Sequence, residues 1–114
     1  MTAPRIDDHV LAMAEQGGYA ESVALPADQC YRLSPRMSLL EAASLSLVYD
    51  TAWFALRERA RLASGEIVLV LGASGGVGLA AVQLARAMGA RVLAGISRPE
   101  KAAATARGRC RSSD

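Results

Sequence analysis

The sequence contains few side chains that bind metals or form disulfides. Its 114 residues include two cysteines, Cys30 and Cys110, and one histidine, His9. Metal sites need three or four ligands at short, characteristic spacings, and these three residues do not form such a set. Nothing indicates a disulfide scaffold, which fits a reducing compartment. We expect His9 to lie in a polar approach to a strand rather than to act as a ligand or catalyst.

Strong net charge and membrane-directing segments are also absent. The formal net charge of +2 is too small to indicate nucleic acid or a membrane surface as a partner. The N-terminal sequence MTAPRIDDHV has acids where a signal peptide has an apolar core. The apolar stretches are too short, or too interrupted by Arg and Gly, to span a bilayer. We expect a soluble, cytoplasmic protein with a solvated, arginine-rich C-terminal end.

The composition, 52% hydrophobic and 21% charged, predicts a packed core without repeats or low-complexity segments. The first third predicts short strands in HVLAMAE and GYAESVALP, with a Gln-Gly-Gly turn between them. A third extended piece, DQCYRLSP, is ended by Pro35, which disfavours helical geometry at the residue before it.

The middle of the chain predicts two helices. Ser38 and Glu41 in SLLE match a capping box, so one helix should run from there to about Val48. A second should run over about 51–62, with apolar residues at three-and-four spacing. Gly65 should end it, because glycine readily adopts the left-handed conformation that follows a helix.

The last third predicts a βαβ unit. EIVLVLGA reads as a parallel strand buried on both faces, and RVLAGIS as a second buried strand. Between them a helix over 76–88, stopped by Gly89, carries an apolar stripe, and Pro99 opens a further helix. The crossover should be right-handed. The order of elements indicates parts of two domains that meet near residues 35–50. The predicted stripe consists of Val77, Ala81, Leu84, Ala85 and Met88.

The glycine-rich turn between the first of these strands and its helix carries the main functional signal. Ala73, Gly75 and Gly78 have the spacing of the dinucleotide-binding fingerprint, with alanine at the first glycine position. A second register, Gly76-x-Gly78-x-x-Ala81, also fits. Such a turn allows the backbone to approach a pyrophosphate, which the N-terminus of the helix attracts. No Gly-Lys-Ser/Thr follows, which excludes a Walker loop, whereas a turn that binds nothing remains an alternative.

The residues after the second strand favour NADP(H) over NAD. An NAD site has an acidic residue about twenty positions after the glycines, to accept the ribose hydroxyl. Here Ser97 and Arg98 stand at that distance, Lys101 follows, and the first carboxylate is Glu100. A hydroxyl near two cations suits a 2′-phosphate. Ser97 and Glu100 also match a capping box, and both cations could be solvated, so these readings stay open.

The segment RARLASGEIVLVLGASGGVGLAAVQLARAMGARVLAGISRPEK closely resembles the cofactor-binding region of zinc-independent medium-chain dehydrogenases/reductases, in the quinone oxidoreductase (zeta-crystallin-like) branch. The resemblance covers about residues 9–103. It implies an α/β fold: an incomplete Rossmann (βαβ) unit preceded by the end of a GroES-like β domain. Residues 1–36 would be the GroES-like remnant, 37–65 the connecting helices and 66–114 a truncated NADP-binding domain.

The resemblance also implies NADPH-dependent reduction of a quinone or of an activated carbonyl or enone, by direct hydride transfer without a metal. It implies that Thr51 lies near the nicotinamide, although a helix N-cap is an equally good interpretation of a threonine there. The pyrophosphate would be held by Gly75, Gly76, Val77 and Gly78, and the 2′-phosphate by Ser97, Arg98 and Lys101.

This chain departs from the family after Lys101, where AAATARGRCRSSD replaces the usual continuation into a helix and third strand. The expected protein is therefore a fragment, inactive alone, because hydride transfer needs a donor and acceptor held in near-attack geometry. The alternative is a truncated gene product that binds NADP(H) or another protein without catalysis. Open sheet edges are expected to favour association.

Overall fold

The computed structural model describes residues 4–97 and residue 100. The chain divides into two packed units, Met1–Leu47 and Val48–Asp114. The helix expected to open at Pro99 falls largely outside the described residues, as do Arg98, Lys101 and the arginine-rich end.

The first unit contains a short antiparallel pair. Strands β1 (Val10–Ala12) and β2 (Cys30–Arg32) pair in the register Val10↔Arg32, and the short helix η1 (Ala27–Gln29) precedes β2. His9 lies directly before β1, as expected, and its carbonyl accepts a 2.9 Å hydrogen bond from the N–H of Leu33. The Asp8 carboxylate lies 3.0 Å from Arg32 Nε, which ties the approach to β1 to the end of β2.

The strand expected in GYAESVALP is absent, so this prediction was wrong. Within residues 13–26 the chain forms bends and irregular backbone only. Tyr19 is fully exposed and Val23 half-exposed. Glu21 and Ser22 interrupt the apolar alternation, so the segment has no continuous apolar face to bury against β1.

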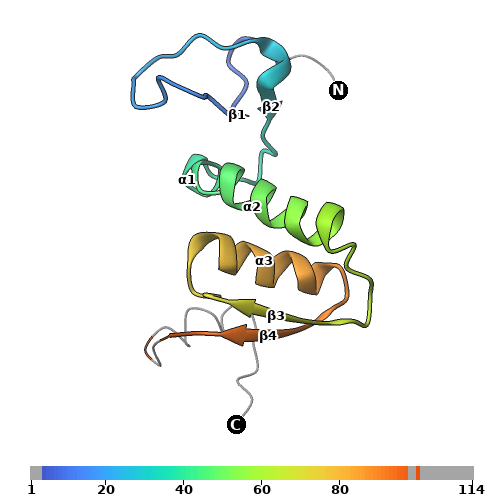
Figure 1. The fold of residues 1–114 in the computed structure, drawn as a ribbon. Helices are drawn as coiled ribbons and strands as arrows, with labels where there is room; N and C mark the ends of the chain where they lie inside the picture. The colour runs from blue at the N-terminus through green and yellow to red at the C-terminus, as the bar shows by residue number, and fades with distance from the viewer. Residues whose placement is uncertain (1–3, 98–99, 101–114) are drawn as a thin grey trace. The chain divides into compact units, whose positions relative to one another are not determined.

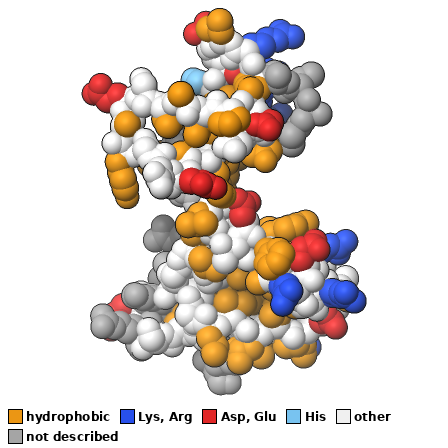
Figure 2. All heavy atoms as spheres, turned by 45° about the horizontal axis from the view of Figure 1, so that its top comes forward, with side chains coloured by type: hydrophobic (Ala, Val, Ile, Leu, Met, Phe, Trp, Pro, Cys, Tyr) orange, Lys and Arg blue, Asp and Glu red, His pale blue; other side chains and the backbone are white. Residues whose placement is uncertain are grey.

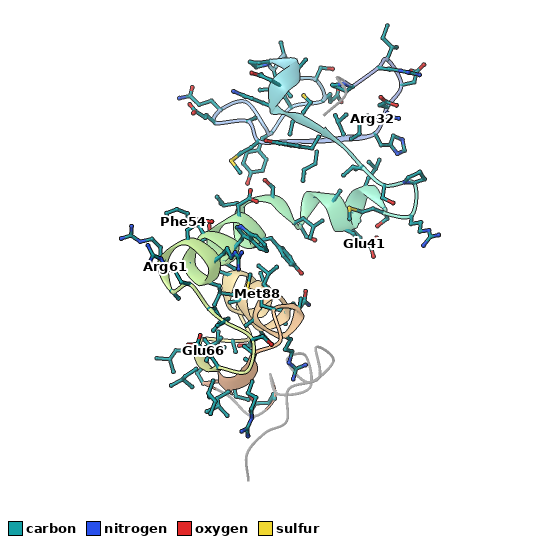
Figure 3. All side chains as sticks on the ribbon, turned by 90° about the vertical axis from the view of Figure 1, so that its right-hand side faces the viewer. Arg32, Glu41, Phe54, Arg61, Glu66 and Met88 are labelled. Atoms are coloured by element: carbon teal, nitrogen blue, oxygen red, sulfur yellow. The ribbon has the colours of Figure 1, made fainter. Side chains whose placement is uncertain are left out.

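Helix α1 (Leu39–Ala43) begins with the predicted capping box but is shorter than expected. Ser38 Oγ accepts a 3.2 Å hydrogen bond from the Glu41 N–H, and the Glu41 carboxylate accepts one of 2.9 Å from the Ser38 N–H (Figure 3). The expected extent to Val48 was wrong. Ser44 donates its hydroxyl to the Glu41 carbonyl at 2.7 Å, and such local bonding competes with the helical ladder.

The second helix begins and ends earlier than the sequence indicates. Helix α2 (Ser46–Trp53) continues directly into η2 (Phe54–Arg59), a π-helical segment. Thr51 therefore lies inside α2, and its interpretation as an N-cap was wrong. Gly65 does not end this helix; it has φ +88 but lies in the turn before the next strand.

Arg61 (labelled in Figure 3) terminates the second helix instead. It has the left-handed φ of +52, and the Leu62 N–H donates back to the Leu56 carbonyl at 2.9 Å. This bond spans one residue more than the 6→1 bond of a Schellman motif, because it closes a π-helical rather than an α-helical segment. As in that motif, an apolar contact accompanies the left-handed residue. Here Leu56 and Leu62 supply that contact, since both are buried in the same core cluster.

The second unit contains the predicted βαβ unit. Strands β3 (Ile67–Leu71) and β4 (Arg91–Gly95) are parallel, in the register Ile67↔Arg91 to Leu71↔Gly95. Helix α3 (Gly76–Ala87) connects them and lies over one face of the pair (Figure 1). Gly89, with φ +83, follows the end of α3 as predicted. The core between α3 and the strands is formed by Val70, Ala73 and Val82.

Three predictions about burial in this unit were wrong. Strand β4 is not buried on both faces, because Leu93 is 46% exposed. Strand β3 is covered on one face only: Val70 is 9% exposed, whereas Leu69 is 60% and Leu71 is 76% exposed. Apolar side chains also lie at the surface on the side of the molecule drawn in Figure 2. On α3, Val82 is fully buried, but Val77 of the expected stripe is 43% exposed. The helix packs against two neighbours, the strands and α2–η2, so its buried surface is not a single stripe (Figure 1).

Candidate functional site

The turn between β3 and α3 is tight and hydrogen-bonded to the neighbouring strand. Gly72 takes a left-handed φ of +66 directly after β3, a conformation that costs glycine little. The N–H of the fully buried Ala73 donates to the Gly95 carbonyl at 3.0 Å. The Gly75 N–H donates to the Gly72 carbonyl at 3.0 Å and closes the turn.

Gly78 brings α3 into close contact with the end of β3. A Cβ at this position would lie 2.9 Å from Ala73 Cα and closer still to the Gly72 carbonyl oxygen. Close helix–strand packing is the role of the last glycine in the dinucleotide-binding fingerprint. Val82 is four residues further along the same helix face and is fully buried, consistent with this approach.

Gly75 is the N-cap of α3 and leaves the N-terminus of the helix open. Its backbone is extended, with φ −82 and ψ 168, and no side chain caps the helix. The first intrahelical bond runs from the Leu79 N–H to the Gly75 carbonyl, at 2.8 Å. The N–H groups of Gly76, Val77 and Gly78 come before that bond, so they point out of the helix end. Partial positive charge at this end attracts anions.

This geometry distinguishes the two fingerprint registers. In the first register Gly75 is the N-cap, where a side chain would meet an approaching ligand. In the second register the first glycine is Gly76, which is already inside the helix. The first register, Ala73-x-Gly75-x-x-Gly78, therefore matches the turn.

Ser97 lies at the same edge of the sheet as the glycine turn. Because Leu71 pairs with Gly95 at the ends of parallel β3 and β4, the segments that follow the two strands leave the sheet together. Ser97 is exposed two residues after β4, and residues 91–97 contain no carboxylate. Arg98 and Lys101 fall outside the described residues.

Thr51 is an exposed residue of α2, whose neighbouring residues adjoin the start of α3. A Cβ on Gly76 would lie 3.3 Å from Val48 Cγ1, three residues before Thr51. The structure therefore places the helix that carries Thr51 beside the first turn of α3.

Within residues 4–97 and at residue 100, no three His, Cys, Asp or Glu side chains are grouped so that they could hold a metal ion. In the same part of the chain no helix combines the length and apolar character needed to cross a membrane.

A parallel βαβ unit with a glycine turn and an open helix N-terminus places the chain in the Rossmann class of α/β folds. No family model matches the sequence. The chain is 47% identical over 77 residues to the quinone oxidoreductase of Sus scrofa. It is 48% identical to the quinone oxidoreductase of Thermus thermophilus, solved also in complex with NADPH, with a TM-score of 0.78 over 82% of this chain. Over the matched residues, the chain belongs to the quinone oxidoreductase family of medium-chain dehydrogenases/reductases, as the sequence indicated.

The family relatives include enoyl reductases. The chain is 34% identical to the CurK enoyl reductase, with a TM-score of 0.71 over 77% of this chain. It spans 23% of the Sus scrofa protein, 32% of the Thermus thermophilus chain and 26% of CurK. The chain thus corresponds to a third or less of the length of each of these relatives.

Proposed function

We propose that this chain forms the pyrophosphate-binding part of an NADP(H) site in an oxidoreductase that reduces quinones, or activated carbonyl or enone compounds. The open N-terminus of α3 at Gly75 is the observation that carries the proposal, because the turn presents backbone N–H groups and no side chain to an anion. The NADPH complex of the Thermus thermophilus relative supports the choice of cofactor.

The proposal assigns the pyrophosphate to the first turn of α3 and the 2′-phosphate to the segment after β4. Ser97 is exposed there. The segment from β4 to Ser97 contains no carboxylate, which would repel a phosphate. Thr51 would lie near the nicotinamide, on the helix that adjoins Gly76. The pyrophosphate would contact Gly75, Gly76, Val77 and Gly78; the 2′-phosphate would contact Ser97, Arg98 and Lys101.

Bound NADPH would supply a hydride to the substrate, without a metal. The residues of this chain would bind and orient the cofactor. We also propose that residues 1–36 are the end of a GroES-like domain, 37–65 connecting helices and 66–114 part of the NADP-binding domain, in a cytoplasmic protein.

We further propose that the 114-residue chain alone does not turn over substrate. A complete dinucleotide fold binds the adenosine half on one βαβαβ unit and the nicotinamide half on the other. The described residues contain one βαβ unit. Without a floor for the nicotinamide, donor and acceptor are not held in near-attack geometry, which is a main source of rate.

Isothermal titration calorimetry of the chain with NADPH and with NADH tests which cofactor it prefers. NADPH should bind more tightly than NADH. Ser97→Asp should lower the affinity for NADPH more than the affinity for NADH, because a carboxylate repels the 2′-phosphate. Equal affinities of the wild-type chain for both cofactors would remove the proposed 2′-phosphate site.

Gly75→Ala tests the pyrophosphate contact itself. A Cβ at Gly75 would lie 3.5 Å from the Gly72 carbonyl oxygen, an ordinary contact, so the fold should persist. The methyl group would nevertheless stand at the N-cap, where the pyrophosphate must approach. Alanine is a poorer N-cap than glycine, so thermal stability should fall slightly while the chain stays folded. NADPH affinity should fall; wild-type affinity in this variant would contradict the assignment.

Enoyl reduction is the second candidate, supported by the likeness to CurK. A quinone and an α,β-unsaturated thioester, each offered with NADPH to a full-length protein that contains this segment, would separate the two activities. In the isolated chain neither substrate should be reduced. Robust turnover by the chain alone would overturn the view that it needs further residues. NADPH binding without turnover even at full length would instead support the non-catalytic alternative.

A further inference from the structure

Helix α2 contacts α3 through a directional hydrogen bond and through apolar side chains. The Tyr49 hydroxyl donates a hydrogen bond to Gln83 Oε1. Near the start of α3, Val48 Cγ1 would lie 3.3 Å from a Cβ on Gly76. These two contacts join adjacent residues of α2 to the first and second halves of α3.

The contact follows the helical repeat on both sides. On α3, Gly76, Ala80 and Gln83 lie at i, i+4 and i+7 and share one face. On α2–η2, Val48, Ala52 and Leu56 lie at i, i+4 and i+8, one helical turn apart from each to the next. Ala52 and Ala80 are each 1% exposed, and Leu56 shares a core cluster with Ala85 near the end of α3. The two helices therefore run side by side (Figure 1).

Small apolar side chains fix the distance between two helices better than their relative rotation and translation. Alanine and glycine present smooth surfaces, whereas a hydrogen bond is directional and weakens steeply when misaligned. The Tyr49–Gln83 hydrogen bond joins the two helices and supplies such a directional constraint on their alignment. Gly76, seven residues before Gln83, follows any shift of α3, and its N–H belongs to the open helix end.

We propose that Tyr49 is a positioning residue: through Gln83 it fixes α3 against α2 and thereby orients the N–H groups of Gly76, Val77 and Gly78. This inference rests on the proposed function of that turn. Loss of the bond lowers the fraction of molecules whose turn is competent to bind, and the apparent dissociation constant rises in proportion.

The test measures binding of NADPH, ADP and adenosine 2′-monophosphate to the 114-residue chain. NADPH and ADP carry a pyrophosphate and need the turn, whereas adenosine 2′-monophosphate does not. Tyr49→Phe should lower the affinity for NADPH and for ADP by about three- to tenfold, the range that the free energy of one ordinary hydrogen bond supplies. Adenosine 2′-monophosphate should be affected by less than about twofold if the lost bond acts through the turn alone.

Three further variants separate positioning from general stability. Gln83→Met removes the acceptor and should reproduce the effect of Tyr49→Phe without changing the tyrosine. Gln83→Glu replaces the amide oxygen with a carboxylate oxygen that can still accept from the Tyr49 hydroxyl, and should retain wild-type affinity for ADP. Tyr31→Phe, at the half-exposed tyrosine of β2, is the matched control. It should leave the affinities for NADPH, ADP and adenosine 2′-monophosphate unchanged.

The outcomes are distinguishable. If Tyr49→Phe lowers the melting temperature but leaves the ratio of ADP to adenosine 2′-monophosphate affinity unchanged, Tyr49 is only structural and the inference is overturned. If the wild-type chain binds neither NADPH nor ADP, the proposed function fails, and the inference fails with it. A selective loss of ADP affinity in both Tyr49→Phe and Gln83→Met supports it.

Discussion

The N–H of Ala73 donates a 3.0 Å hydrogen bond to the carbonyl of Gly95, which joins the glycine turn to the last residue of β4. The bond continues the β3–β4 hydrogen bonding past Leu71, the last paired residue of β3, to Ala73. It also links the turn directly, through a backbone hydrogen bond, to the segment that leads from Gly95 to Ser97. A ligand that orders the turn should therefore also change the environment of Ser97.

Replacement of Gly78 by alanine should destabilise the chain. The new Cβ would lie 2.9 Å from Ala73 Cα and closer still to the Gly72 carbonyl oxygen, and both are backbone atoms that cannot rotate away. Overpacking of this kind costs about 1–3 kcal/mol. The better helix propensity of alanine, about 1 kcal/mol, offsets part of that cost. Urea unfolding followed by circular dichroism would measure the net loss.

Gly18→Ala is the control for this variant, since a Cβ at Gly18 meets nothing within 4 Å. It should leave the unfolding midpoint unchanged. A Gly78→Ala protein as stable as the wild type would show that α3 does not need its close approach to β3.

The two faces of β3 should respond very differently to truncation. Val70→Ala removes methyl groups from the core and should cost about 2 kcal/mol. Leu69→Ala, at a residue 60% exposed, should cost less than about 0.5 kcal/mol although it removes more atoms. Equilibrium unfolding of both variants at one protein concentration would give the comparison. Equal losses would mean that the exposed face is covered in solution.

Gly89→Ala should destabilise the chain for two separable reasons. The backbone has φ +83, which alanine rarely adopts, and the added Cβ would lie 2.5 Å from Ser64 Oγ. We expect a loss of about 1–3 kcal/mol from the backbone conformation alone. Ser64→Ala in the same chain removes the clash with Oγ and should restore stability only in part. Full restoration would show that the conformational cost is absent.

The Glu41 carboxyl should titrate below its ordinary value of 4.5. The Ser38 N–H first, and the Ser38 hydroxyl second, bond the carboxylate and lower its pKa. Because the folded pKa is depressed, the associated stability is present at pH values above the ordinary pKa. It is lost as the pH falls through the folded value. Carbon-detected NMR titration of Glu41 would measure this midpoint.

Ser38→Ala should raise the Glu41 pKa only partway towards 4.5, because it removes the hydroxyl and keeps the backbone N–H. The same variant removes the acceptor for the Glu41 N–H, and loss of such an N-cap costs about 1 kcal/mol of helix stability. A Glu41 midpoint at or above 4.5 in the wild-type chain would show that the capping box does not persist in solution.

Features specified by neighbouring residues were predictable from the sequence. The capping box needs only Ser38 and Glu41, and the βαβ order follows from two apolar runs around an amphipathic helix. The geometry of the turn was predictable because the spacing of its glycines follows from what a tight turn and close helix–strand packing require of the backbone. Gly72 was missed, although a glycine directly after a strand is a recognised signal for a left-handed turn.

Features that depend on packing between distant segments were not predictable. Arg61 adopts a left-handed conformation at the end of η2, and no local pattern distinguishes this arginine from its neighbours. The contact of Tyr49 with Gln83 joins residues 34 positions apart, so periodicity within either helix does not reveal it. Burial on β3 depends on whether a second layer covers the strand, which its apolar run cannot show.

The close approach at Gly78 has an evolutionary consequence. That glycine satisfies a steric demand of helix–strand packing whether or not a nucleotide ever binds. A descendant that had lost the cofactor would still be under selection to keep Gly78, while Gly75, which makes only ordinary contacts, would be free to drift. Among related chains, retention of the residue at the N-cap of α3 is therefore the more informative mark of a nucleotide-binding protein.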